Sequence, residues 1–396
     1  MRRDQLHQKI IDRLERLPPP FQAHDGVVPV PPPESIPMYE LNAPAASAIE
    51  AIGRLDAIVS ASPQPFLATR ILHRQEALSS SAIEGTQSTL DEILELDATG
   101  ADSGQAAARQ VRSYSLTLER FLALLQRDGR SALTLDLVRS LHRDIMSTDP
   151  GYEDPPGEFR QRVVWIGGGR LDIAHSTFNP PPPGRVLDCM NDHLRFLRED
   201  VDVVQPLPLP IRMALGHAHF EAIHPFRDGN GRVGRILLPL QMAAEGHAPL
   251  FLAPYLEAHR SDYYAALKEA QQRLSLHPLC ELFCLAIVAA VKEVEETMRA
   301  LSALRQRWAV AVSFRQGSSA RRALDLLSSW PVLTVARLSE LLGVSFQAAN
   351  DAVERLTQAG ILTERTGYQK NRIFAAKDVL HIVNRPFGTP PPDAAF

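Results

Sequence analysis

The sequence of 396 residues has little cysteine, no long hydrophobic run and no excess of positive charge. Its longest apolar run, Leu282 to Val291, has ten residues, whereas a membrane-spanning helix needs roughly twenty. Residues 1–17 carry charges throughout and contain no apolar signal-peptide core. These absences argue against a membrane protein and predict a cytoplasmic protein with no membrane partner.

The three cysteines, Cys189, Cys280 and Cys284, fit a reducing compartment, and the last two lie in an apolar helical pattern that predicts buried thiols. The formal net charge is −4, whereas a general nucleic-acid binder is usually basic. Apolar residues make up 45% and charged residues 22% of the chain. This balance is typical of a globular protein and excludes a disordered or collagen-like chain.

Proline is abundant, with 31 residues, and its clusters form stiff connectors before helical patterns. Most of the chain shows helical hydrophobic spacing and little strand-type alternation, so we expect a mainly α fold. We predict an N-terminal arm with helices, a helical core, a C-terminal segment and a tail, over residues 1–110, 111–305, 316–383 and 384–396. Within the core, residues 156–178 predict a β-hairpin, with β-branched residues on one side of a glycine turn.

Residues 316–383 follow the helix–helix–turn–helix–hairpin order that is typical of a winged helix-turn-helix. This segment has eight Lys and Arg against six Asp and Glu. Its expected recognition helix, 346–358, carries Asp351 and Glu354 against Arg355 alone, which is a poor surface for phosphates. DNA binding and protein or dimer contact both stay open for this segment.

The densest signal is HPFRDGNGRVGR at residues 224–235. The turn Gly229-Asn230-Gly231 opens an apolar-striped helix, so it presents backbone N–H donors and the positive end of the helix dipole to an anion. Arg232 and Arg235 lie three residues apart, and their guanidinium groups suit a polyphosphate.

Three further residues of this motif have chemistry to offer. Asp228 suits Mg²⁺, which prefers one carboxylate together with phosphate oxygens and water. His224 is close enough in the chain to act as a base. Phe226 lies between them, and we expect it to pack under the loop.

A zinc site formed by His217, His219 and His224 is an alternative that lacks the HExxH spacing. The motif is not a Walker A loop, because no GKS or GKT follows it.

The motif resembles the Fic-family signature HxFx(D/E)GNGRxxR, with no departure. The resemblance extends over about residues 15–300, through HAHFEAIHPF, PGEFR and YLEAHRSDYYAAL. It implies a Fic-type helical core with a β-hairpin flap. It also implies Mg²⁺-dependent transfer of AMP from ATP to a Ser, Thr or Tyr hydroxyl of a protein target, with self-modification included.

By this resemblance, His224 is the base that deprotonates the target hydroxyl, and Asp228 binds Mg²⁺. The resemblance also implies a set of nucleotide-binding residues: Phe226, Asp228, Gly229, Asn230, Gly231, Arg232, Arg235, Tyr263 and Tyr264. Within this set, Arg232 supports the β-phosphate and Arg235 the γ-phosphate, and the two tyrosines lie on the adenine side. A target-aligning flap is implied for Val164, Trp165, Ile166, Gly167 and Gly168, where a target segment pairs by its backbone.

The sequence SSSAIEGT at residues 79–86 ends a predicted helix with Gly85 at its C′ position. Glu84 in the last turn faces the negative end of the helix dipole, so it needs a cationic partner. Ser80, Glu84 and Gly85 match the inhibitory pattern (S/T)xxxE(G/N) of Fic proteins. The resemblance implies that Glu84 pairs with Arg235 and withholds it from the γ-phosphate. The alternative is a surface carboxylate at a helix end.

Two other functions remain open. One is a winged-helix DNA-binding regulator whose Fic core only senses nucleotide and needs no base at His224. The other is a Fic enzyme that acts mainly in removing AMP. The sequence leaves the target protein and a possible homodimer undetermined.

Overall fold

The computed structural model describes residues 1–61, 69–100, 106–168, 172–199, 207–312, 314–367 and 371–392. The chain divides into two compact units, each built from two stretches of sequence. The core unit contains Met1–Ile58 and Leu116–Ala290, and the second unit contains Val59–Ser115 and Val291–Phe396. The sequence analysis divided the chain into four segments, whereas the two compact units each combine distant stretches. The four segments stay a prediction about domains.

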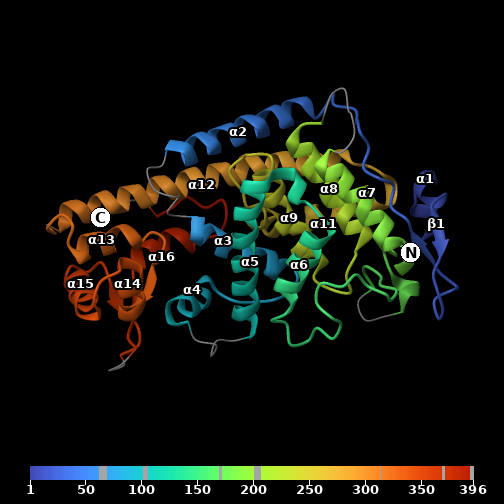
Figure 1. The fold of residues 1–396 in the computed structure, drawn as a ribbon. Coiled ribbons are helices and arrows are strands. Elements are labelled where there is room, and N and C mark those ends of the chain that lie inside the picture. The colour runs from blue at the N-terminus through green and yellow to red at the C-terminus, as the bar shows by residue number, and fades with distance from the viewer. Residues whose placement is uncertain are drawn as a thin grey trace. The chain divides into compact units, whose positions relative to one another are not determined.

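The core unit is mainly helical, as the sequence predicts (Figure 1). Its described α-helices, some of which continue into the second unit, are α1 (Gln8–Ile11), α2 (Asn42–Ala61), α5 (Ala106–Asp128), α6 (Leu135–Met146), α7 (Val186–Arg198), α8 (Leu209–Ile223), α9 (Asn230–Ala244), α10 (Ala253–Ala258), α11 (Arg260–Arg273) and α12 (His277–Ala311). Short 3₁₀ turns lie at η1 (Arg3–Gln5), η2 (Gly129–Ala132), η3 (Ile173–His175) and η4 (Pro183–Arg185). Near the N-terminus, β1 (Leu14–Arg16) pairs antiparallel with β2 (Asp25–Val27).

Helices α8 and α9 form the centre of the core unit. Every residue of α8 is buried, and α9 is buried along nearly its whole length. A helix that is buried on all sides must be covered by other helices, and α8 packs against α7, α9 and α11. Gly234 permits the close approach of α9 to α8, because a Cβ there would lie 2.7 Å from Oε1 of Glu221.

The expected β-hairpin over residues 156–178 is much shorter than predicted. Within its described residues, the pairing is a single antiparallel bridge between Ile166 and Phe178. The N–H of Ile166 donates to the Phe178 carbonyl at 2.8 Å, and the Thr177 N–H donates to the Ile166 carbonyl at 2.8 Å. The expected returning strand begins instead as the 3₁₀ turn η3. The first strand of the hairpin therefore has no extended backbone to pair with at these residues.

The second unit contains α3 (Thr69–Ile83) and α4 (Leu90–Thr99) together with the C-terminal elements. We call residues 319–383 the C-terminal module. Its described elements, in chain order, are α13 (Ser319–Leu326), β3 (Val332–Thr334), α14 (Val335–Leu342), α15 (Phe346–Gln358), β4 (Thr363–Glu364), β5 (Ile373–Ala375) and α16 (Lys377–Val383). The three strands form an antiparallel sheet in the order β3-β5-β4.

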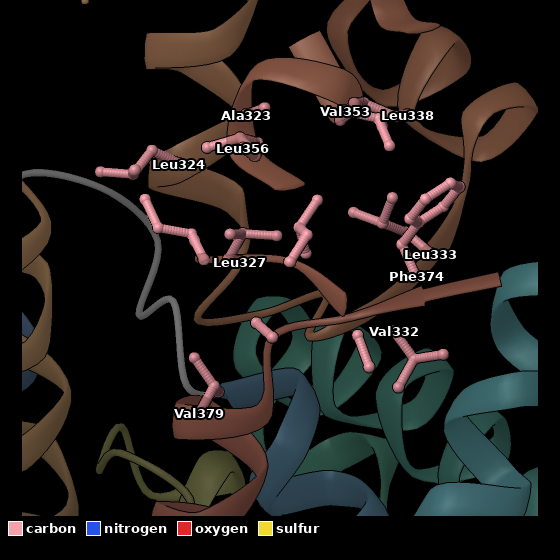
Figure 2. Packing of buried hydrophobic residues seen from close by; sticks show 14 of the residues in the cluster. Ala323, Leu324, Leu327, Val332, Leu333, Leu338, Val353, Leu356, Phe374 and Val379 are labelled. Carbon is pink, nitrogen blue, oxygen red and sulfur yellow. The ribbon is translucent and has the colours of Figure 1, made fainter. Parts of the chain in front are cut away.

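A hydrophobic core fills the C-terminal module, with side chains from its helices and its sheet pointing toward one another (Figure 2). Thr334 caps α14 as expected, because its hydroxyl accepts the Arg337 N–H at 3.1 Å. Gly343 and Gly360 follow α14 and α15 with φ values of 62° and 73°, which favour glycine. The sequence did not predict strand β3, whose three residues are too few to show alternation.

Among the described helices, none is long and apolar enough to cross a membrane. The three cysteines are buried and free, as expected. Burial raises the pKa of Cys189 to about 11 and the pKa of both Cys280 and Cys284 to about 12, so these thiols stay protonated near neutral pH.

Candidate anion-binding site

The loop of residues 224–229 connects the two buried helices α8 and α9. His224 ends α8 in the left-handed conformation, with φ 49° and ψ 61°, and its N–H donates to the Phe220 carbonyl at 3.0 Å. Gly229 opens α9 with φ 75°. A Cβ at Gly229 would lie 2.6 Å from Sδ of Met146, so only glycine fits this turn without displacement.

The side chain of Asn230 holds the loop in shape by bonding to the backbone of Phe226. Its Oδ1 accepts the Phe226 N–H at 2.8 Å, and its Nδ2 donates to the Phe226 carbonyl at 2.9 Å. The Asn230 side chain is therefore occupied inside the loop, and any ligand contact from this residue comes from its backbone. Phe226 is fully buried, which fits the predicted anchor and leaves its ring no exposed surface for a nucleotide.

His142 on α6 supports this loop, and the sequence analysis did not identify it. Its ring stacks on Phe226 with centroids 3.7 Å apart. The Gly157 N–H donates to Nδ1 at 2.8 Å, so Nε2 carries the proton and donates to the Asp228 carbonyl at 3.1 Å. Burial lowers the pKa of His142 to about 4, with a further lowering from Arg232, so the ring is neutral near pH 7.

Arg160 is a second support that the sequence analysis did not single out. Its Nε donates to the His224 carbonyl at 2.7 Å, and its Nη2 donates to the carbonyls of Pro181 at 2.7 Å and Ile223 at 3.3 Å. Its own N–H donates to the Pro225 carbonyl at 2.9 Å. The side chain is 3% exposed, and burial lowers its pKa to about 10. The buried guanidinium of Arg160 thus holds the backbone at His224 in place.

The first turn of α9 has the donors and charges that an anion would need. No side chain caps it, so the N–H groups of its first residues keep their donor capacity. Two arginines lie in the next positions, and Arg232 and Arg235 are 4% and 1% exposed. Buried cations at the positive end of a helix dipole favour a negatively charged ligand, and two of them suit more than one phosphate.

Arg232 has a distant carboxylate partner in the described part of the chain. Its Nη2 contacts Sδ of Met146 at 3.1 Å, and the Asp149 carboxylate lies 3.9 Å away. Within the described residues its buried Nε makes no hydrogen bond. A buried donor without a partner is costly, so this nitrogen is best explained by a ligand that supplies an acceptor.

Asp228 lies at the mouth of the same turn, with an exposed side chain. Its Oδ1 accepts the Gly229 N–H at 2.6 Å, which orients the carboxylate. In the described part of the chain, no three His, Cys, Asp or Glu side chains gather as a metal cage. This finding weighs against the zinc alternative. A single oriented carboxylate instead fits Mg²⁺ that takes its other ligands from phosphate and water.

The two tyrosines expected on the adenine side have different surroundings. Tyr263 is 1% exposed, and its hydroxyl lies 2.7 Å from Nε2 of His217. The other ring nitrogen of His217 lies 3.3 Å from the Gly234 carbonyl and so carries the proton, which makes Nε2 the acceptor. Tyr264 is 44% exposed, with Arg260 over its ring at 5.7 Å. Only Tyr264 of this pair has an open face for an aromatic ligand.

The expected flap residues, 164–168, lie on both sides of Ile166, which forms the single bridge to Phe178. Within the described residues, the backbone groups of Val164 and Trp165 make no hydrogen bond, so an edge is available for pairing with an extended peptide. Gly167 and Gly168 have φ values of 77° and 75°, and a Cβ on Gly167 would lie 2.4 Å from Oγ1 of Thr177. This tight turn requires glycine.

The expected inhibitory residues lie at the end of α3 in the second unit. Ser80 is fully buried, whereas Glu84 is exposed. Gly85 has φ 89°, and its N–H donates to the Ala82 carbonyl at 3.0 Å, which matches the predicted helix end.

Parts of the chain match known proteins. Residues 132–242 match the Fic/DOC family, and residues 43–120 match the Fic/DOC family N-terminal region. Protein adenylyltransferase Fic from Drosophila erecta is 33% identical over 143 residues, which cover 35% of this chain and 25% of that protein. Protein adenylyltransferase fic-1 from Caenorhabditis briggsae is 32% identical over 156 residues, or 38% of this chain and 27% of that protein. The chain thus spans about a quarter of the length of these curated relatives.

Two solved structures have a similar fold. A Fic family protein from Desulfovibrio desulfuricans G20 gives a TM-score of 0.55 at 20% identity and covers 87% of this chain and 98% of that chain. Fic-1 from C. elegans gives a TM-score of 0.52 at 21% identity, covering 66% and 74%.

Proposed function

We propose that this Fic family protein transfers AMP from ATP to a hydroxyl group of a protein side chain. His224 takes the proton from the hydroxyl, whose oxygen forms a bond to the α-phosphorus. The bond from the α-phosphorus to the oxygen that bridges to the β-phosphate breaks, and pyrophosphate leaves. Curated relatives named protein adenylyltransferase support this reaction for the family.

The observation that carries the proposal is the Nε of buried Arg232, which makes no hydrogen bond to any described residue and lies on a helix whose first turn no side chain caps. A triphosphate supplies acceptors to both. Arg235 lies one helical turn further and extends the positive surface for the γ-phosphate. The uncapped turn faces the loop that carries His224, so a base and an anion site occur at one helix junction.

Asp228 is the proposed ligand of Mg²⁺. When bound, the ion neutralises phosphate charge and draws electrons from the α-phosphorus. The Gly229 N–H donates to one carboxylate oxygen of Asp228, and the other oxygen would bind the ion. The target hydroxyl is expected to approach along the edge of Val164 and Trp165, where backbone pairing requires little target sequence.

Incubating the protein with Mg²⁺ and ATP labelled on its α-phosphate tests the proposal. Label on the chain itself, or on proteins of a lysate, supports transfer of AMP. Label from γ-labelled ATP instead would indicate a kinase reaction and contradict the proposal. Release of AMP from a pre-labelled target would favour the de-AMPylating alternative.

Arg160 provides a test of how firmly His224 must be held. Lysine keeps the charge but has one nitrogen, which cannot reach the His224, Pro181 and Ile223 carbonyls together. We expect Arg160→Lys to lower the transfer rate roughly tenfold to a hundredfold, because small misplacements of a reacting group cost that much. The exposed neighbour provides the control, since Arg162→Lys should keep the rate. A normal rate in Arg160→Lys would show that these hydrogen bonds do not position the base.

The inhibitory role of Glu84 is part of the proposal and rests on the sequence pattern. If Glu84 competes with the γ-phosphate for Arg235, Glu84→Gly should raise transfer about tenfold or more, since charge-assisted pairs contribute roughly 1.5–3 kcal/mol. Arg235→Ala should be inactive. The double variant should be inactive as well, and initial rates of label transfer measure all three. An active double variant would place the inhibition elsewhere.

For the C-terminal module, we propose a winged helix-turn-helix. The order α13–β3–α14–α15–β4–β5 with a three-stranded sheet supports this assignment. Its surface charge does not favour DNA, because α15 carries Asp351 and Glu354 beside the exposed Phe346.

A further inference from the structure

The segment that carries Ser80 and Glu84 shares one hydrophobic core with the C-terminal end of the chain. From α3 and α4, this core contains Ile71, Leu90, Leu94 and Ala98. From α12 it contains Leu301, Leu304 and Trp308. From the C-terminal module it contains a larger set of side chains, part of which Figure 2 shows. Helices α3 and α4 are thus built into the C-terminal module, although more than 200 residues separate them in sequence.

A buried carboxylate organises the helices on one side of this core. Asp97 of α4 is 2% exposed and forms ion pairs with Arg70, Arg74 and Arg112. The pairs to Arg74 and Arg112 have distances of 2.8 Å and 2.9 Å. Burial by itself would raise the pKa of Asp97, but Arg74 and Arg70 together hold it below its usual value. The charged carboxylate therefore joins α3, α4 and the start of α5 into one assembly.

Polar contacts then connect this assembly to the C-terminal module. The guanidinium of Arg70 lies 3.4 Å from the ring centre of Trp330. Nε2 of Gln75 donates to the Val383 carbonyl at 2.6 Å. The buried Thr334 hydroxyl lies 3.3 Å from the Ala98 carbonyl. Two of these contacts come from α3 itself, so motion of the module is transmitted to α3 directly.

A pair of half-buried acids on α4 completes the contact. Arg365, next to strand β4, donates to Asp91 at 3.2 Å and to Glu95 at 3.3 Å. This arginine belongs to the region that a winged helix would offer to DNA, yet it is engaged inside the chain. Arg372 is engaged as well, with Asn350 at 3.3 Å and Glu364 at 3.6 Å. Phosphates would have to displace these pairs.

We propose that the C-terminal module is the control element of α3: it holds the helix that carries Glu84, and loosening this contact releases inhibition of AMP transfer. This inference rests on the proposed inhibitory role of Glu84. It assigns the module an internal regulatory function, in place of DNA recognition, because Arg365 is used on α4 and the core of the module is shared with α3 and α4. A ligand that pulls the module from these helices would activate the enzyme.

Charge reversal of Arg365 in the full chain tests the inference. Arg365→Glu places a third acid beside Asp91 and Glu95, so it should raise amide hydrogen exchange over residues 70–83 about threefold to tenfold. The rate of AMP transfer should rise by a similar factor. Arg355→Glu is the matched control, because it makes the same charge change on the exposed face of α15 and should alter neither quantity.

A second route uses Trp330, whose change to Ala removes the ring under Arg70 and should have the same two effects. Unchanged exchange over residues 346–358 shows that the module stays folded. In a Glu84→Gly background, Arg365→Glu should still raise exchange of α3 but should not raise transfer further, because the inhibitory carboxylate is already absent.

The outcomes separate this inference from the proposed function. If Glu84→Gly activates transfer while Arg365→Glu and Trp330→Ala do not, control by the module is wrong and the inhibitory role of Glu84 stands. Faster exchange of α3 without faster transfer overturns the inference in the same way. If Glu84→Gly does not activate transfer, the inhibitory part of the proposed function fails, and this inference fails with it.

Discussion

Replacing His224 by Ala is expected to reduce AMP transfer by roughly 10² to 10⁴-fold, the usual effect of removing a general base. The affinity for ATP should change little, because Arg232, Arg235 and the first turn of α9 stay in place. Single-turnover transfer of α-labelled ATP measures the first quantity, and equilibrium binding of ATP measures the second. The exposed His175 supplies a control, and His175→Ala should behave as wild type.

The two readouts distinguish a base from a structural residue. His224 is a helix C-cap in the left-handed conformation with its carbonyl bound by Arg160, so its backbone also shapes the loop. If the variant lost ATP affinity as strongly as activity, the side chain would serve to build the phosphate site. His224→Asn separates the two further, because Asn tolerates the left-handed conformation yet cannot accept the proton at neutral pH.

The motif of residues 224–235 was predictable because all its residues lie close together in the sequence. A glycine turn, two arginines and an apolar stripe within twelve residues predict an anion site at a helix start. Helix α9 begins at Asn230, inside the predicted turn. The supports were harder to predict because they come from distant segments. His142 shows one usable signal: it occupies a buried position on the apolar face of α6, where a polar ring needs a partner. Arg160 gives no such periodic signal.

The division into two units was not predictable from periodicity. Helical spacing shows which face of α4 is apolar, but it does not show that Leu94 packs in the same core as Leu301 and Leu324. Such contacts depend on three-dimensional packing across more than 200 residues. The shortening of the hairpin was not predictable for a similar reason. The β-branched residues around Val164 favour extended backbone, but they do not specify the strand with which it pairs.

Below pH 6.5 the free energy of unfolding of the core unit is expected to fall steeply. Burial lowers the pKa of His193 and His217 to about 3, and that of His219 well below its usual value. The unfolded chain therefore binds protons that the folded chain does not bind. Stability is full above pH 6.5 and is lost as the pH falls toward 3. Each histidine contributes about 1.4 kcal/mol per pH unit.

His193 is the sharpest test, since its ring nitrogens are buried and, within the described residues, make no hydrogen bond. Its ring lies 5.7 Å from His219 and 5.5 Å from Phe220, so phenylalanine can take its place in an aromatic environment. The free energy of unfolding of His193→Phe should be nearly that of the wild type at pH 7. At pH 4.5 it should be about 2–3 kcal/mol higher than that of the wild type. Urea titrations at both pH values measure this difference. His175→Gln, at an exposed position, should keep the wild-type pH dependence, and an equally steep loss in His193→Phe would show that His193 is not buried as a neutral ring.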